Sequence, residues 1–240
     1  MAPLSEARAS ITAHLEELRS RVFKAALAVI VASVVAFLFR NWIFDLLVAP
    51  YEAVSEARQL VFFRPTEAFS LFMRISLFAG FVLASPVVIY QLWRFVSPAL
   101  TRRERRWVIP IVASLAVLFL AGIAFGYWSL QRGLGFLLDF GSDRLEPTIG
   151  GDHYLTFALR FLLVFGLAFE FPVFLFLAAA TGIVSWRSLA GNRRWAVLAI
   201  VTVGAVVTPS GDPLTLILLS TPLYLLYEAD IWLIRFVLRK

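Results

Sequence analysis

Long apolar runs alternate with short charged segments along this sequence, and that alternation constrains the fold more than any other feature. A transmembrane helix needs about 20 mostly apolar residues. Six runs meet this requirement in full or in part, at residues 22–39, 68–93, 107–130, 155–180, 195–208 and 214–227. Only 16% of the residues are charged and 60% are hydrophobic, which is typical of an integral membrane protein. We therefore predict an all-α membrane protein with six spans, in which residues 1–240 form a single domain.

Lysine and arginine residues predict the orientation of the spans, because they are enriched in cytoplasmic loops. Fifteen of them lie in the amino terminus, the 94–106 loop, the 181–194 loop and the carboxyl terminus. Only five lie in the loops on the opposite side. Both termini are therefore predicted to be cytoplasmic, and the net charge of +6 is assigned to cytoplasmic loops rather than to nucleic-acid binding.

The fifth and sixth runs are short, and three runs contain an internal proline. At 1.5 Å per residue, a helix of about 15 residues covers roughly 22 Å, less than the roughly 30 Å hydrocarbon core. In one interpretation both helices are short, and they thin the bilayer or pack against partners. In the other, both helices extend into their polar flanks. Pro86, Pro172 and Pro222 each remove a helical hydrogen bond, so kinked helices and a cupped bundle are predicted. The loop of residues 41–67 is predicted to hold an interfacial helix.

Several classes of chemistry are excluded by what the sequence lacks. It has no cysteine, and its two histidines, His14 and His153, are far apart, so neither disulfides nor a metal site are expected. The sequence also lacks the motifs of serine hydrolases, zinc proteases and phosphate-binding loops. We therefore predict that the protein is not an enzyme and has no cofactor.

Glu170 is an acidic residue within the fourth apolar run. An ionisable group at this depth costs a few kcal/mol, so it normally faces a cavity or a partner. One interpretation is a polar contact on a concave surface or at a subunit interface. The other is a protonated glutamic acid that bonds a nearby backbone carbonyl and has only a packing role. A proton-coupled secondary transporter that uses Glu170 is the alternative function, although the sequence shows no inverted repeat.

Two further carboxylates lie in segments that are otherwise rich in arginine. Glu104 is surrounded by four arginines, and with Thr101 it forms the pattern of a capping box. Glu17 is four residues from Arg21 and forms an ion pair with it if this segment is helical. The two acids could instead bind two arginines of a ligand, since a guanidinium pairs well with a carboxylate. Asp212 lies in a turn, where simple turn chemistry is the simpler interpretation.

Six segments, in order, resemble the motifs of the TatC family, the polytopic subunit of the twin-arginine protein translocase. The first three are His14-Leu-Glu-Glu-Leu-Arg-Ser-Arg21, Pro65-Thr-Glu-Ala-Phe69 and the stretch from Ser85 to Arg105. The others are Phe165 to Pro172, Thr208-Pro209 with Asp212, and Pro222 to Glu228. Each match alone is weak, but six in order in a chain of this length are specific.

The resemblance implies a receptor and core of a translocase in the bacterial cytoplasmic membrane. Such proteins bind signal peptides with consecutive arginines, work in an oligomeric complex with the single-span subunits TatA and TatB, and use the protonmotive force to export folded cargo. The implied signal-peptide residues are the acids Glu17 and Glu104 with their neighbours Arg19, Arg21, Phe95 and Arg105. The resemblance also implies a partner contact at Glu170 and outer-face functional positions at Pro50 and Asp212.

Overall fold

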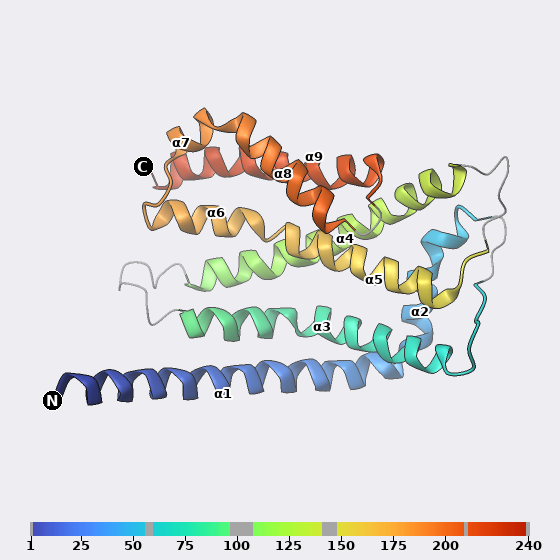
Figure 1. The fold of residues 1–240 in the computed structure, drawn as a ribbon, viewed down its shortest axis with the longest axis horizontal. Coiled ribbons are helices and arrows are strands. Elements are labelled where there is room, and N and C mark those ends of the chain that lie inside the picture. The colour runs from blue at the N-terminus through green and yellow to red at the C-terminus, as the bar shows by residue number, and fades with distance from the viewer. Residues whose placement is uncertain (1, 56–59, 97–107, 141–147, 209–210, 239–240) are drawn as a thin grey trace. The chain divides into compact units, whose positions relative to one another are not determined.

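A computed structural model describes residues 2–55, 60–96, 108–140, 148–208 and 211–238 (Figure 1). Nearly all of these residues are helical, which confirms the predicted all-α class. The helices are α1 (Ala2–Leu38), α2 (Arg40–Glu52), α3 (Glu67–Val96), α4 (Val108–Asp139), α5 (Gly151–Ala168), α6 (Phe171–Ala180), α7 (Trp186–Gly191), α8 (Arg193–Val207) and α9 (Pro213–Leu233). A short π-helical segment, η3 (Ile234–Leu238), continues α9.

Five helical stretches in the described ranges are long and apolar enough to cross a membrane. They are His14–Leu38, Glu67–Phe95, Ile109–Asp139, Gly151–Ala180 and Pro213–Leu238, and they match the first, second, third, fourth and sixth predicted runs. The fifth run forms α8, which has only 15 residues. Because α8 is shorter than a typical span, the sixth crossing and the cytoplasmic position of both termini stay predictions.

The prediction that the sixth span is short is wrong. Helix α9 has 21 residues, and with η3 the apolar helical stretch reaches 26. Glu228 and Asp230 interrupt the apolar run in the sequence, but neither ends the helix. The Glu228 carboxylate accepts two hydrogen bonds from the Arg193 guanidinium at 2.6 and 3.1 Å, and Asp230 is buried. For this run the alternative, extension into polar flanks, is correct.

The three prolines have different effects on their helices. The fourth run is interrupted between Ala168 and Phe171, and Pro172 lies in the first turn of α6, where its missing N–H is tolerated. The helix is thus interrupted close to Pro172, where the sequence predicts a kink, while the cupped bundle stays a prediction. Pro86 and Pro222 lie inside α3 and α9, which continue on both sides of them. Helix α2 confirms the predicted helix in the 41–67 loop, while its position at the membrane interface stays a prediction.

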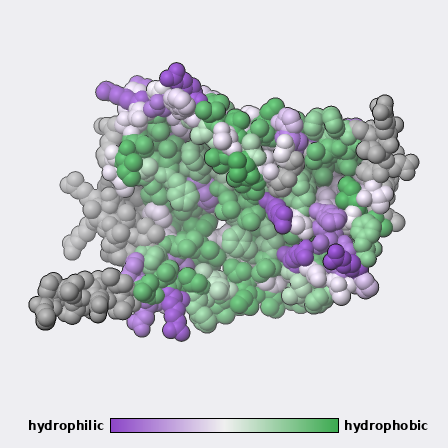
Figure 2. Space-filling view, viewed as in Figure 1, coloured by the Kyte–Doolittle hydropathy of each residue, from purple (hydrophilic) through white to green (hydrophobic). Residues whose placement is uncertain are grey.

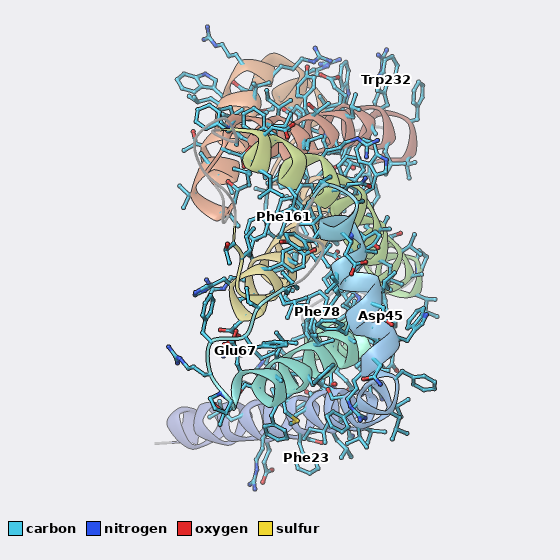
Figure 3. The ribbon with its side chains drawn as sticks, turned by 90° about the vertical axis from the view of Figure 1, so that its right-hand side faces the viewer. Phe23, Asp45, Glu67, Phe78, Phe161 and Trp232 are labelled. Carbon is cyan, nitrogen blue, oxygen red and sulfur yellow. The ribbon has the colours of Figure 1, made fainter. Side chains whose placement is uncertain are left out.

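One compact unit of the chain comprises Met1–Ile43 and Phe72–Ala116. In this unit α1 and α3 lie side by side (Figure 1). A Cβ atom at Gly80 would approach the Cα and backbone nitrogen of Ser33 to 2.5 Å, so only glycine fits at this crossing. The outer surface of α1 is apolar, and Phe23, which is 67% exposed, points away from α3 (Figure 3). An apolar exposed face of this kind is expected of a helix in lipid.

The other compact unit comprises Phe44–Leu71 and Val117–Lys240. Its core includes Leu155, Phe161 and Phe165 of α5 and Leu219 of α9, all of them buried. Within this unit α9 packs against α6, α7 and α8. Hydrophobic residues cover most of the molecular face seen in Figure 2, which agrees with the membrane assignment.

Candidate functional site

Four of the predicted signal-peptide residues lie on two helices of the first unit. Glu17, Arg19 and Arg21 are on α1, and Phe95 is in the last turn of α3. Arg19 is exposed, whereas Glu17, Arg21 and Phe95 are partly buried. Glu104, Arg105 and the predicted capping box from Thr101 to Glu104 lie outside the described residues, and their positions stay predictions.

The carboxylate of Glu17 binds the guanidinium of Arg21. Arg21 donates hydrogen bonds from Nη2 and Nε to Oε1 of Glu17, at 2.7 and 3.2 Å. The side chain of Glu17 is 33% exposed, and that of Arg21 is 15% exposed. Residues four apart lie on the same face of a helix, so this contact confirms the ion pair that the spacing predicted. An arginine of the chain itself therefore occupies one oxygen of the proposed receptor carboxylate.

Two contacts connect this middle part of α1 to the last turns of α3. The Nη1 atom of Arg21 donates to Oε1 of Gln91 at 3.4 Å, and the rings of His14 and Phe95 stack with their centroids 4.4 Å apart. No role for His14 or Gln91 was predicted from the sequence, although both lie in motif segments. A signal for both residues was present in the helical spacing. His14 precedes Arg21 by seven residues and Gln91 precedes Phe95 by four, and each of these spacings places the two residues on one face of their helix.

Glu170 lies in the second unit, at the break between α5 and α6. It is 7% exposed, and neither carboxyl oxygen has a hydrogen-bond partner among the described residues. It stands at the amino-terminal cap of α6, but its side chain makes no capping bond. The alternative in which Glu170 bonds a neighbouring backbone carbonyl is therefore not observed in the described part of the chain. A buried, unbonded carboxyl group is costly, so its position favours a polar partner from outside.

Pro50 is buried inside α2 and explains an unusual contact there. Proline has no N–H, so the carbonyl four residues earlier, that of Leu46, receives no helical hydrogen bond from it. The hydroxyl of Tyr127 donates to this Leu46 carbonyl at 2.8 Å instead. Pro50 thus makes a carbonyl of α2 available for a bond from α4, and its predicted role on the outer face stays a prediction.

Asp212 is buried and caps the first turn of α9. Its Oδ1 atom accepts a hydrogen bond from the N–H of Thr215 at 2.7 Å. Aspartate is a favoured residue at this position because its side chain satisfies an N–H that lacks a helical partner. The geometry agrees with the simpler interpretation, local backbone chemistry, and a further role of Asp212 on the outer face stays a prediction.

Glu67, at the start of α3, holds two segments of the backbone together, a role that its motif alone did not predict (Figure 3). Its Oε2 atom accepts the N–H groups of Phe63 and Arg64 at 2.9 and 3.2 Å, and its Oε1 atom accepts that of Asp152 at 3.1 Å. One carboxylate therefore fixes the segment before α3 to the first turn of α5. Nearby, Val61 forms a parallel bridge with Gly150.

Glu67→Ala is expected to loosen this connection, because three backbone N–H groups lose their acceptor together. Hydrogen exchange measured by mass spectrometry on the purified protein should show faster exchange in peptides that contain Phe63, Arg64 and Asp152. The control is Glu52→Ala, which removes an exposed carboxylate of α2. Equal exchange in both variants would contradict the assigned role of Glu67.

Among the described residues, no three histidine, cysteine or acidic side chains are grouped so that they could hold a metal ion. Instead, an acid and an arginine pair in the middle of α1, near the last turns of α3, and a buried acid lies between α5 and α6. This set of residues suits the recognition of charged or polar partners.

Comparison with known proteins identifies the family. Residues 13–222 match the family described as "Sec-independent protein translocase protein (TatC)". The TatC protein of Frankia casuarinae is 41% identical over 94% of this chain and 65% of its own length. That of Carboxydothermus hydrogenoformans is 36% identical over 95% of this chain and 93% of its own length.

A crystal structure described as the twin arginine translocase receptor TatC has the same fold. It aligns with a TM-score of 0.78 and 36% identity, over 92% of this chain and 99% of the crystallised chain. Proteins of this family are translocase components rather than enzymes. The match over residues 13–222, together with the relatives and the shared fold, shows that this membrane protein belongs to the TatC family of Sec-independent protein translocase proteins.

Proposed function

We propose that this protein is the core and signal-peptide receptor of a twin-arginine translocase. The observation that carries the proposal is the Glu17–Arg21 contact, in which the carboxylate binds a guanidinium at 2.7 Å. Of the described residues, only Arg21 donates to Glu17, and both of its bonds go to Oε1. The Oε2 atom of Glu17 is thus left to accept a bond from an arginine of a ligand.

In this proposal Glu104 provides the second carboxylate, so that two acids bind two consecutive arginines. Arg19, Arg21, Phe95 and Arg105 surround the pair and align the peptide. Arginine is preferred over lysine because its planar guanidinium forms paired bonds with a carboxylate, whereas an ammonium acts as a point charge. The site lies at the cytoplasmic face of a bacterial inner membrane, with both termini on that side.

Complementation of a bacterial strain that lacks this subunit tests the function. The wild-type chain should restore export of a folded reporter that carries a twin-arginine signal peptide. Glu104→Lys should abolish export while the variant still inserts, because a carboxylate is replaced by a repelling cation. A photo-crosslinker at position 104 should label the signal peptide. Unchanged export together with no crosslink would overturn the assignment.

Glu170 is proposed to contact the single-span partners TatA and TatB within an oligomeric complex. Glu170→Ala is expected to leave signal-peptide binding unchanged but to weaken partner assembly or transport, because the variant has no polar group to bind the partner. Co-purification of the partners with each variant measures this. Glu170→Gln is the comparison, since it retains hydrogen-bonding capacity without the carboxylate. Full assembly and full transport by Glu170→Ala would favour a packing role.

Transport is proposed to use the protonmotive force. A second candidate, a proton-coupled secondary transporter, is favoured by one observation: Glu170 is buried without a hydrogen-bond partner among the described residues. Reconstituted protein, without partners, would then show substrate-dependent proton flux. Such flux, with no effect of the chain on reporter export, would replace the translocase proposal.

A further inference from the structure

Arginine and aromatic side chains gather where α7 meets the end of α9, within the second compact unit. Arg235, on η3, holds its guanidinium carbon (Cζ) 4.8 Å from the ring centre of Trp186 on α7. The same Cζ atom is 5.9 Å from the ring centres of Trp232 and Phe236. The Cζ atom of Arg187 is 5.5 Å from the Trp186 ring as well. We name these five residues the arginine–tryptophan cluster.

Two contacts fix α7 and α8 to α9 beside the cluster. The hydroxyl of Tyr227 donates to the carbonyl of Leu189 at 2.8 Å, which joins α9 to α7. The guanidinium of Arg193, the first residue of α8, donates to the Glu228 carboxylate of α9 at 2.6 and 3.1 Å. Trp186 lies on the same short helix as Leu189, so these bonds hold its ring next to the end of α9. The cluster is therefore formed by tertiary structure and not by one segment alone.

The two arginines of the cluster carry charge that no acid balances in the described part of the chain. Arg187 and Arg235 are exposed, and neither has a carboxylate or a hydrogen-bond acceptor as partner there. The acids nearest to Arg235 in the sequence are not available, because Glu228 binds Arg193 and Asp230 is buried. A guanidinium held over a ring keeps its N–H donors at its edge, where they bind oxyanions such as phosphate. The cluster therefore offers two cationic donors to an anion.

An apolar surface adjoins these donors along α9. The rings of Trp232 and Phe236 stack with their centroids 5.8 Å apart, and Leu233 and Val237 are exposed beside them. Trp232 points outward from α9 (Figure 3). In Figure 2 hydrophilic side chains gather around α7, next to the hydrophobic surface of the neighbouring helices. The apolar stretch Pro213–Leu238 ends at the cluster, so the cluster lies where a span meets the headgroup layer of a membrane.

We propose that the arginine–tryptophan cluster binds the phosphate headgroup of an anionic phospholipid, while the acyl chains lie along the exposed apolar face of α9. This lipid site is independent of the proposed receptor function. Charge complementarity favours an anionic lipid over phosphatidylcholine, because two guanidinium groups repel the choline cation. The apolar face favours a lipid over a soluble anion, which would leave that face in contact with water. The bound lipid joins Arg187 of α7 to Arg235 of η3.

Lipid binding to the purified full-length protein, measured by native mass spectrometry, tests the inference. Palmitoyl-oleoyl phosphatidylglycerol and the matching phosphatidylcholine are titrated separately into protein in the same detergent. Wild-type protein should bind phosphatidylglycerol roughly fivefold to thirtyfold more tightly, the range expected for one or two arginines near an anionic headgroup. Equal affinity for the two lipids would overturn the inference and leave the receptor function untouched.

Arg235→Gln should lower the affinity for phosphatidylglycerol about fivefold and leave that for phosphatidylcholine unchanged, because it removes one of the two charges. Arg194→Gln is the matched control. Arg194 is also exposed, and its Cζ atom lies 5.7 Å from the ring centre of Trp195, outside the cluster. This variant should bind both lipids as wild type does. Equal loss in the two variants would overturn the inference, because the net charge of this end would then decide binding. Unchanged binding by Arg235→Gln would overturn it as well.

A second measurement uses the unaltered protein and does not depend on the folding of a variant. The protein is placed in phosphatidylcholine nanodiscs with a trace of phosphatidylglycerol that carries a diazirine in its acyl chain. Adducts should concentrate in the peptide that contains residues 232–237, and added unlabelled phosphatidylglycerol should remove them. Labelling spread evenly over the apolar helices would overturn the inference, because the lipid would then have no preferred site. So would displacement by inorganic phosphate at matched ionic strength, because the ligand would then be a soluble anion.

Discussion

Glu17→Lys is expected to abolish export of proteins with twin-arginine signal peptides, while the variant still accumulates in the membrane. The change removes the carboxylate that binds Arg21 and places a second cation four residues from it, on the same face of α1. A ligand arginine would then meet two positive charges and no acceptor. Export of a folded reporter in the complemented strain measures the effect, and membrane fractions probed for the variant measure its accumulation.

Glu16→Lys is the matched control, because it makes the same charge change at an exposed neighbouring position. Successive residues point about 100° apart around a helix, so lysine at position 16 does not face Arg21. This variant should export the reporter nearly as well as wild type. Equal loss of export in both variants would mean that the net charge of the segment matters, and not the carboxylate of Glu17.

Gly122→Ala is expected to destabilise the protein by about 1–3 kcal/mol, the usual cost of overpacking a well-packed core. A Cβ atom at this position would lie 2.5 Å from the carbonyl oxygen of Phe165 and 2.9 Å from the Cα of Gly166. Both are backbone atoms of α5, so α4 and α5 must move apart to admit a single methyl group. Thermal unfolding of the purified protein in detergent should show a clearly lower midpoint.

Gly135→Ala, in the same helix, is the control for this prediction. Its Cβ atom would lie 3.7 Å from the nearest atom, Cγ1 of Val54, which is an ordinary contact. Alanine is the better helix former by about 1 kcal/mol, so this variant should be as stable as wild type or slightly more stable. Equal midpoints for the two variants would contradict the close approach of α4 and α5 at Gly122.

The helical class and the positions of most spans could be predicted because they depend on local sequence. A long apolar run in a chain with few charges has to form a helix in lipid, where every backbone polar group must be bonded internally. The Glu17–Arg21 pair was also predictable, since a spacing of four residues on one helix brings the two side chains together. The resemblance to the TatC family added the functional meaning of these acids.

The end of the last span could not be predicted from hydropathy. Glu228 and Asp230 are charged, which by hydropathy indicates a loop. Only the structure shows that Glu228 pairs with Arg193, which is far away in the sequence. An ion pair of this kind lowers the cost of keeping a carboxylate in an apolar helix, so α9 continues to Leu233. Hydropathy considers each residue alone and omits such partners.

The sequence by itself determined the membrane class, the apolar helices and the acids and arginines that are proposed to recognise a ligand. The tertiary structure decided which of these groups meet. It brought Arg21 to Gln91 and His14 to Phe95, and it left Glu170 without a hydrogen-bond partner among the described residues. The physical reason is range: helical spacing fixes contacts within one turn, whereas contacts between helices depend on how closely their backbones approach.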